Sequence, residues 1–336
     1  MKITKYIACA MLLLAAVGCE KHKILYNTTS LADLNREAEF QLHYFVPMQD
    51  VSTNYIDSVF VNGELYTSVN GAGQLMSPNG LPVTRSRFYA IQPGEIHIEF
   101  MRNDETVYKG TATLPKGKSN VIVYDHEKDP LVIDNEFPYF QATRKLDLEH
   151  FNTDTVESLR LINLLFEEKG VPYPGKLQYQ YRDYDTKDTI AWKADAKDPT
   201  KLVPITEYNT WKNVGEPVGF GETTKRVLVH VDKIKGINAS GFNSSGTAYL
   251  YYRIILPGEY ETVEGALDAN GKPINLQVPK QLKGYWSKTA TEMSNYSDYW
   301  TAYIGGVYNH FLCGIRTSKN DNAEETYGRV KSWCSL

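Results

Sequence analysis

The sequence is poor in cysteine and has no second long apolar run after its N-terminal segment. It holds four cysteines in 336 residues, and the chain beyond Cys19 alternates polar and apolar residues over short distances. A membrane-spanning helix needs roughly 20 consecutive apolar residues. Beyond Cys19 the sequence therefore carries no signal for a transmembrane helix.

Short motifs that mark common catalytic sites are also missing. We find no His-Glu-x-x-His pattern, no Gly-x-Ser-x-Gly turn, no glycine-rich phosphate loop and no cysteine with a paired base. Glycosidases need only two carboxylates at a suitable separation, and no motif singles out such a pair. We therefore expect a non-enzymatic protein without cofactor or metal. A glycan-processing enzyme, or an accessory of one, is kept as an alternative.

Clusters of lysine and arginine are absent as well. The formal net charge is −4, and basic residues are scattered among acidic ones. Nucleic-acid phosphates attract proteins through grouped positive charges. We therefore expect no nucleic-acid partner.

The N-terminus has the composition of an export signal. Lys2 and Lys5 precede an apolar run that ends in small residues before Cys19, which predicts a signal peptide over residues 1–18. The segment Ala16-Val17-Gly18-Cys19 resembles the lipobox of bacterial lipoproteins. This resemblance implies that Cys19 is acylated and anchors the protein to a membrane. An ordinary cleaved signal and an uncleaved anchor are the alternatives.

Residues 19–38 are mostly polar and predict a tether between the lipid and the folded chain. The expected location is the outer membrane, with the periplasmic and the cell-surface face both open.

The remaining cysteines lie near the C-terminus. Cys9 would leave with the signal and Cys19 would carry lipid, so only Cys313 and Cys334 remain. In an oxidising compartment two such cysteines are expected to pair, and we predict a disulfide between them. Two free thiols or a half-built metal site are the alternatives. His310 does not complete a four-ligand zinc set.

The chain predicts an all-β fold. It contains 24 tyrosines, many β-branched residues and few segments with helical periodicity. Residues 39–134 show several short alternating runs separated by turn signals, a pattern typical of a β-sandwich. In the first run Phe40, Leu42 and Tyr44 alternate with Gln41 and His43, which places His43 on the outward face.

The same spacing of runs and turns recurs further along the chain. Residues 135–157 form a connector of scattered charge, and residues 158–260 predict a second sandwich. We interpret the two segments as a tandem duplication.

Three segments of the first unit carry a resemblance to known domains. They are Ile-Asp-Ser-Val-Phe-Val-Asn-Gly at 56–63, Tyr-Ala-Ile-Gln-Pro-Gly at 89–94, and Lys116-Gly117 before Val-Ile-Val at 121–123. In that order they resemble the uncharacterised immunoglobulin-like β-sandwich domains of Bacteroidetes-type envelope lipoproteins. The resemblance implies an architecture of two tandem immunoglobulin-like sandwiches and no catalytic residues.

Residues 261–336 are rich in aromatic side chains among Ser, Thr and Asn, and predict a β extension. Trp286, Tyr299 and Trp300 have polar neighbours and are our candidate binding residues. Tyr and Trp present apolar faces and polar tips, which suits contact with sugars or proteins. The alternative is that they belong to the core of a β module.

Two acidic segments suggest metal ligands only superficially. We interpret Asp125-His126-Glu127 with Asp129 as a polar segment that follows the end of a strand. Asp183, Asp185 and Asp188 lack the glycine and distal glutamate of a calcium loop, and so read as a hairpin tip.

These observations predict a lipid-anchored envelope protein that binds a glycan or an envelope protein without catalysis. A second hypothesis is a structural or anchoring subunit of a surface fimbria, in which an edge strand pairs with a neighbouring subunit.

Overall fold

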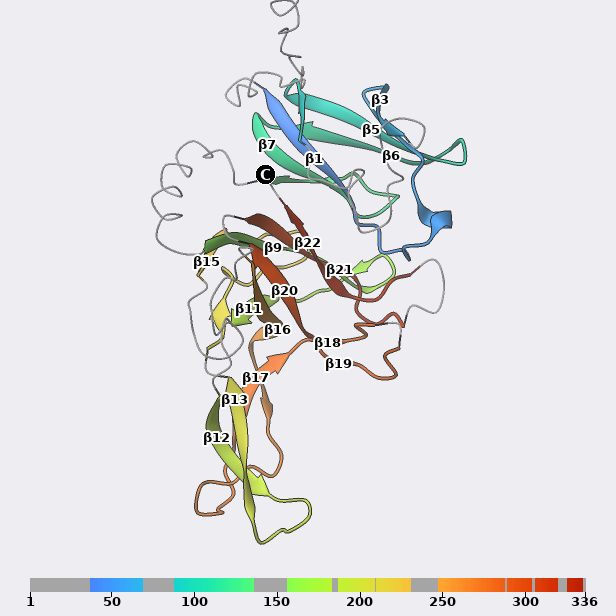
Figure 1. Cartoon of the computed structure of the whole chain (residues 1–336). Helices are drawn as coiled ribbons and strands as arrows, with labels where there is room; N and C mark the ends of the chain where they lie inside the picture. The colour runs from blue at the N-terminus through green and yellow to red at the C-terminus, as the bar shows by residue number, and fades with distance from the viewer. Residues whose placement is uncertain are drawn as a thin grey trace, which may run out of the picture.

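The computed structural model describes residues 37–68, 88–135, 156–182, 187–208, 210–230, 247–287, 289–303, 306–319 and 325–334. These residues form two β-sandwich units stacked end to end (Figure 1). The all-β prediction is confirmed. The predicted signal peptide, Cys19, nearly all of the tether and most of the connector lie outside the described residues. No helix in the described ranges is long and apolar enough to cross a membrane.

The first unit consists of two four-stranded sheets in the described residues. Their orders are β4-β1-β7-β8 and β3-β2-β5-β6, and β1 runs parallel to β7 while the other neighbours are antiparallel. The strands are β1 (Ala38–Tyr44), β2 (Ser58–Val61), β3 (Glu64–Ser68), β4 (Tyr89–Ile91), β5 (Gly94–Arg102), β6 (Glu105–Leu114), β7 (Gly117–Val123) and β8 (Leu131–Asp134), with a 3-10 turn at Ser52–Asn54.

Local sequence explains the hairpins and the core of this unit. Asn62 and Gly63 join β2 to β3 with φ of 53° and 80°, the left-handed pair that a tight hairpin turn requires. Along β5, Ile96 and Ile98 are buried while His97 between them is exposed. The alternation of the sequence therefore directs one face of β5 into the core.

The second unit repeats the topology of the first. Its two sheets contain β15-β9-β21-β22 and β14-β11-β16-β20, and β9 runs parallel to β21 as β1 does to β7. In chain order each strand matches its counterpart, which agrees with the tandem duplication inferred from spacing. The strands are β9 (Val156–Glu168), β11 (Gln178–Arg182), β14 (Lys212–Asn213), β15 (Val227–His230), β16 (Thr247–Thr262), β20 (Ser297–Tyr303), β21 (Val307–Ile315) and β22 (Arg329–Cys334).

The predicted boundary at residue 260 is wrong. Strands β20, β21 and β22 fall in the predicted C-terminal extension, yet they supply members of both sheets of the second unit. Leu161 of β9 lies directly beside His310 of β21. The pairing of strands far apart in the sequence leaves no signal in neighbouring residues. The sequence pattern alone therefore did not predict which sheets these strands join.

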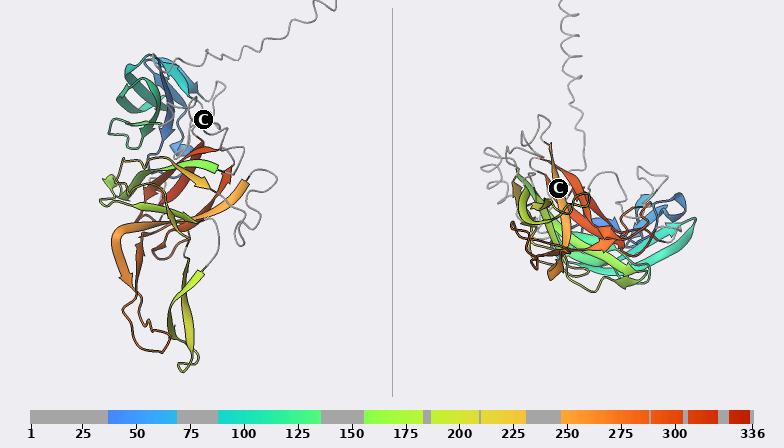
Figure 2. Two further views of the ribbon diagram at one scale, coloured as in Figure 1. Left: turned by 90° about the vertical axis from the view of Figure 1, so that its left-hand side faces the viewer. Right: turned by 90° about the horizontal axis from the view of Figure 1, so that it is seen from below.

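Further strands are inserted into the second copy. They are β10 (Val171–Pro172), β12 (Lys187–Ala194), β13 (Leu202–Tyr208), β17 (Gln277–Gln281), β18 (Lys283–Gly284) and β19 (Ser294–Asn295). The β12–β13 hairpin and the far ends of β16 and β17 form an arm that projects away from the first unit (Figures 1 and 2). Reciprocal backbone hydrogen bonds between Trp192 and Leu267, at 2.9 and 2.7 Å, join the two hairpins.

The two units meet through an apolar cluster. Phe45 and Ile122 of the first unit pack with Ile162, Leu164 and Phe311 of the second. The rings of Phe45 and Phe311 are stacked with centroids 4.5 Å apart. This contact closes the outer face of the β4-β1-β7-β8 sheet.

His43 is buried, which corrects the prediction that it points to solvent. Its ring lies 4.8 Å from that of Phe311, and its Nε2 is 3.1 Å from Oδ1 of Asn120. The alternation along β1 placed His43 on the correct face of the strand. The second unit covers that face, so both faces of β1 are buried.

A buried polar network fixes the two units in one arrangement. Arg160 of β9 donates to the carbonyl oxygen of Asp134 at 2.6 Å and to Oδ1 of Asn309 at 2.9 Å. Arg226 donates to the same Asn309 oxygen at 2.9 Å and to the carbonyl oxygen of Asn135. Charged donors make the stronger hydrogen bonds, and their geometry is directional. The junction is therefore oriented as well as packed.

Candidate functional site

Exposed tyrosines gather on the outer face of the β14-β11-β16-β20 sheet. Along β16, Ala248 and Leu250 point into the core while Tyr249 and Tyr251 point outward. Tyr251 lies directly opposite Tyr299 of β20. The exposed fractions of Tyr249 and Tyr299 are 55% and 54%, so much of their surface is open to a partner.

We call Tyr249, Tyr251 and Tyr299 the tyrosine row. The ring of Tyr299 meets that of Tyr249 edge-on at 5.5 Å and that of Tyr251 at 6.0 Å. Such edge and tilted contacts are the favoured geometries of aromatic pairs. The row is therefore a set of mutually supported rings and not three independent side chains.

Arginine side chains extend the row toward the base of the arm. The guanidinium carbon of Arg182 lies 3.6 Å from the ring centroid of Tyr208 and 4.5 Å from that of Tyr251. Arg253 lies 4.3 Å from the ring of Trp211 and forms an ion pair with Glu207 at 3.1 Å. Stacking of a cation on an aromatic face stabilises both. Arg182 thus holds Tyr251 in place from the side away from Tyr299.

Trp300 belongs to the core, which corrects its prediction as an exposed binding residue. Only 7% of it is exposed, and it lies between the outward-facing Tyr299 and Thr301 of β20. Its Nε1 donates to Oε1 of Glu157 at 2.9 Å. The adjacent Tyr299 and Thr301, whose polar groups suggested exposure, are on the opposite face of the strand, because strand side chains alternate.

Trp286 is half-buried in a slot between two glycines. A Cβ at Gly328 would lie 2.5 Å from the Trp286 ring, and one at Gly284 would lie 2.8 Å from it. The Trp286 Nε1 donates to the carbonyl oxygen of Ser294 at 2.6 Å. Trp286 is therefore packed against the core of the second unit. Of the three predicted binding residues, Tyr299 is the one on the open surface.

Tyr249, Tyr251 and Arg182 were not among the binding residues predicted from the sequence. A signal for the first two was present, since tyrosines two positions apart in a predicted strand share one face. No signal identified Arg182, because its stacking depends on strands β11 and β16 being neighbours.

The predicted disulfide does not form. Cys313 is a free, buried thiol, and burial raises its pKa to about 11. Cys313 lies opposite Arg329 on β22, whereas Cys334 lies opposite Tyr308. Five positions along a strand span about 17 Å, far beyond the Cα separation of about 7 Å that a disulfide tolerates.

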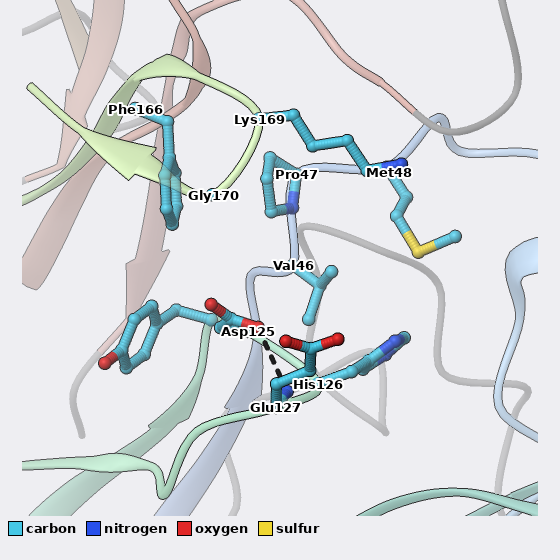
Figure 3. A pocket seen from close by; sticks show the side chains of 10 residues that line it. Val46, Pro47, Met48, Asp125, His126, Glu127, Phe166, Lys169 and Gly170 are labelled. Atoms are coloured by element: carbon cyan, nitrogen blue, oxygen red, sulfur yellow. Dashed lines mark hydrogen bonds between the residues drawn. The ribbon is translucent and has the colours of Figure 1, made fainter.

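A cavity of about 490 Å³ lies between the two units (Figure 3). It includes Asp125, His126 and Glu127, the segment interpreted above as a strand exit, which follows β7 as predicted. His126 Nε2 is 3.0 Å from Oη of Tyr44, and burial lowers the His126 pKa to about 4. No group of three or more His, Cys, Asp or Glu able to hold a metal occurs in the described part of the chain. Asp183 and Asp185 lie outside it.

No family model and no curated protein matches the chain. The chain is similar to a crystal structure of a proposed cell adhesion protein from Bacteroides eggerthii, with 8% sequence identity and a TM-score of 0.22. That match covers 89% of this chain and 95% of the other.

Proposed function

We propose that the chain is a non-catalytic binding protein that recognises a glycan through the tyrosine row. The observation that carries this proposal is the pair of open rings, Tyr249 and Tyr299, held on neighbouring strands of a rigid sheet. Both rings are braced by neighbours before any partner arrives. Binding therefore costs little ordering of side chains.

The chemistry of the row suits a sugar. A tyrosine offers a large apolar face and a hydroxyl tip, and it has few rotatable bonds to immobilise. A sugar ring likewise has apolar C–H faces bordered by hydroxyl groups. Tyr303, with an exposed fraction of 43%, lies on the same strand as Tyr299 and offers a further contact.

The proposed setting is the outer membrane, with a lipid anchor at Cys19. The chain enters the first unit at β1, and the tyrosine row lies on the second unit (Figure 1). The first unit thus separates the row from the anchored end of the chain. A partner at some distance from the lipid surface would be within reach.

A glycan array probed with the detergent-extracted full chain tests the proposal. We expect Tyr299→Ala and Tyr249→Ala each to weaken glycan binding by about tenfold or more, with an unchanged unfolding midpoint. Tyr260→Ala is the matched control, because Tyr260 is 60% exposed but lies on the arm. No glycan signal, or full binding by Tyr299→Ala, would overturn the proposal. Capture of an envelope protein that Tyr299→Ala abolishes, without any glycan signal, would identify a protein partner instead.

A structural subunit of a fimbria is the second candidate. Strand β22 ends the order of its sheet in the described residues, and an edge strand can pair with a strand of another chain. Ladders of the chain after mild extraction would favour this function, whereas a concentration-independent monomer would favour glycan binding.

An enzyme is the third candidate, because the carboxylates of Asp125 and Glu127 line one cavity. Release of new reducing ends from an array glycan, abolished by Glu127→Gln, would support it.

A further inference from the structure

A second aromatic contact lies further along the strand that carries Tyr299. Strand β20 runs beside β16 (Figure 1), and its residues Tyr299, Thr301 and Tyr303 alternate with the buried Trp300 and Ala302. Tyr303 therefore lies on the same face of β20 as Tyr299. From Tyr299 to Tyr303 the strand spans about 14 Å. The two tyrosines would therefore contact different sugar residues of one glycan chain.

The ring of Tyr303 is held in place before a ligand arrives. It stacks on the ring of Tyr308 with centroids 5.9 Å apart and an interplanar angle of 25°. Gly306 leaves room for this contact, because a Cβ there would lie 2.5 Å from the Tyr308 ring. Tyr303 nevertheless keeps an exposed fraction of 43%. We call Tyr303 and Tyr308 the tyrosine pair.

The backbone of β20 is fixed at both of its ring-bearing positions. The N–H of Tyr299 donates to Oδ1 of Asp298 at 2.8 Å. The N–H of Tyr303 donates to Oε2 of Glu157 at 2.7 Å. Between these positions β20 pairs with β16 in one continuous register. The sheet therefore sets the distance between the tyrosine row and the tyrosine pair.

We propose that the tyrosine row and the tyrosine pair bind one linear, extended glycan chain that lies along β20. This inference rests on the proposed glycan-binding function and specifies its ligand as a trisaccharide or longer. A chain that follows a strand must itself be straight over the same length. A β-1,4-linked glucose chain is an extended ribbon whose apolar C–H faces can lie on aromatic rings, whereas an α-1,4-linked chain coils. Thr301, between the two contacts, offers its hydroxyl to a middle sugar.

Calorimetric titration of the full chain with the series from cellobiose to cellohexaose tests this inference. We expect the affinity to rise by about tenfold or more from cellobiose to cellotetraose, because the second contact becomes intramolecular once the first is made. Tyr303→Ala should bind cellobiose nearly as the wild type does, and cellotetraose about as weakly as cellobiose. Tyr303→Phe keeps the ring and should keep the dependence on chain length.

Tyr260→Ala, on the arm, is the matched control and should leave every affinity unchanged. The length series of the wild type tests the proposal whatever the stability of the variants. Equal affinities for cellobiose and cellotetraose, or no binding of cellotetraose, would overturn the proposal. An unchanged length dependence in Tyr303→Ala would do the same, as would tighter binding of maltotetraose than of cellotetraose. Binding of any array glycan that Tyr299→Ala abolishes would still support the glycan function, so the two proposals can fail separately.

Discussion

Trp300 donates a hydrogen bond from Nε1 to Oε1 of Glu157 across the interior of the second sandwich, at 2.9 Å. Glu157 stands near the start of β9 in one sheet, and Trp300 lies within β20 of the other. The second oxygen of Glu157 accepts the backbone N–H of Tyr303 at 2.7 Å. One buried carboxylate thus fixes the strand that carries Tyr299.

Glu157 should make the stability of the protein depend on pH. Burial raises its pKa from 4.5 to about 7 in the folded state, so the folded protein binds this proton more tightly than the unfolded chain does. The stabilising contribution is complete below pH 4.5 and is lost as the pH rises through 7, by about 3 kcal/mol in all. In urea unfolding from about pH 5 to about pH 8, we expect Glu157→Gln to lose this slope.

Buried histidines change the stability of the protein with pH in the opposite direction. The pH dependence of Glu157→Gln must therefore be compared with that of the wild type. Burial lowers the pKa values of His43 and His310 to about 3, so they destabilise the fold as the pH falls below 6.5. The difference between wild type and Glu157→Gln removes their effect. Glu264→Gln, on an exposed glutamate, is the control. Parallel pH curves for wild type and Glu157→Gln would contradict the prediction.

Gly328 should tolerate no larger side chain while Trp286 is present. A methyl group at Gly328 would lie 2.5 Å from the indole ring, and overpacking of this kind costs about 1–3 kcal/mol. We expect Gly328→Ala to lower the free energy of unfolding by that amount. In Trp286→Ala the same methyl group should cost less, because the ring it would meet is gone.

Chemical denaturation of the four chains in this double-mutant cycle measures the coupling. Gly219→Ala is the control, since a Cβ there would meet only the flexible carboxylate of Glu222 at 3.4 Å. If the changes in the free energy of unfolding caused by Gly328→Ala and Trp286→Ala were additive, the glycine would not constrain the Trp286 ring.

Cys313 should not react in the native protein. Its thiol is buried with a pKa raised to about 11, and only the thiolate is nucleophilic. We expect iodoacetamide to leave Cys313 unmodified in the folded full chain and to alkylate it in urea, as read by peptide mass spectrometry. A crosslinked peptide containing Cys313 and Cys334 in a non-reducing digest would contradict the structure.

Phe311 should couple the unfolding of the two units. Its ring stacks on Phe45 across the junction at 4.5 Å, and truncating a buried phenylalanine costs about 3–5 kcal/mol. We expect Phe311→Ala to separate a single calorimetric transition into two. Phe100→Ala is the matched control, because Phe100 is equally buried but lies inside the first core. A single, merely lowered transition for Phe311→Ala would show that other contacts hold the units together.

The sequence by itself determined the elements that depend on neighbouring residues. Alternating runs and the turn signals between them predicted the all-β class and the sandwich of residues 39–134. Spacing of strands and turns predicted a repeated unit, and the two units have matching strand orders in their sheets. Polar neighbours also led to Tyr299, which is exposed.

Only the tertiary structure decided which side chains are exposed to solvent and whether the two C-terminal cysteines lie close together. Trp300 and His43 are buried because another sheet or the other unit covers them. Cys313 and Cys334 are kept apart by the register of β21 and β22. The tyrosine row exists because β16 and β20 are neighbours in space. Period-two alternation tells which side of a strand a residue occupies, but contacts between distant segments determine what lies on that side.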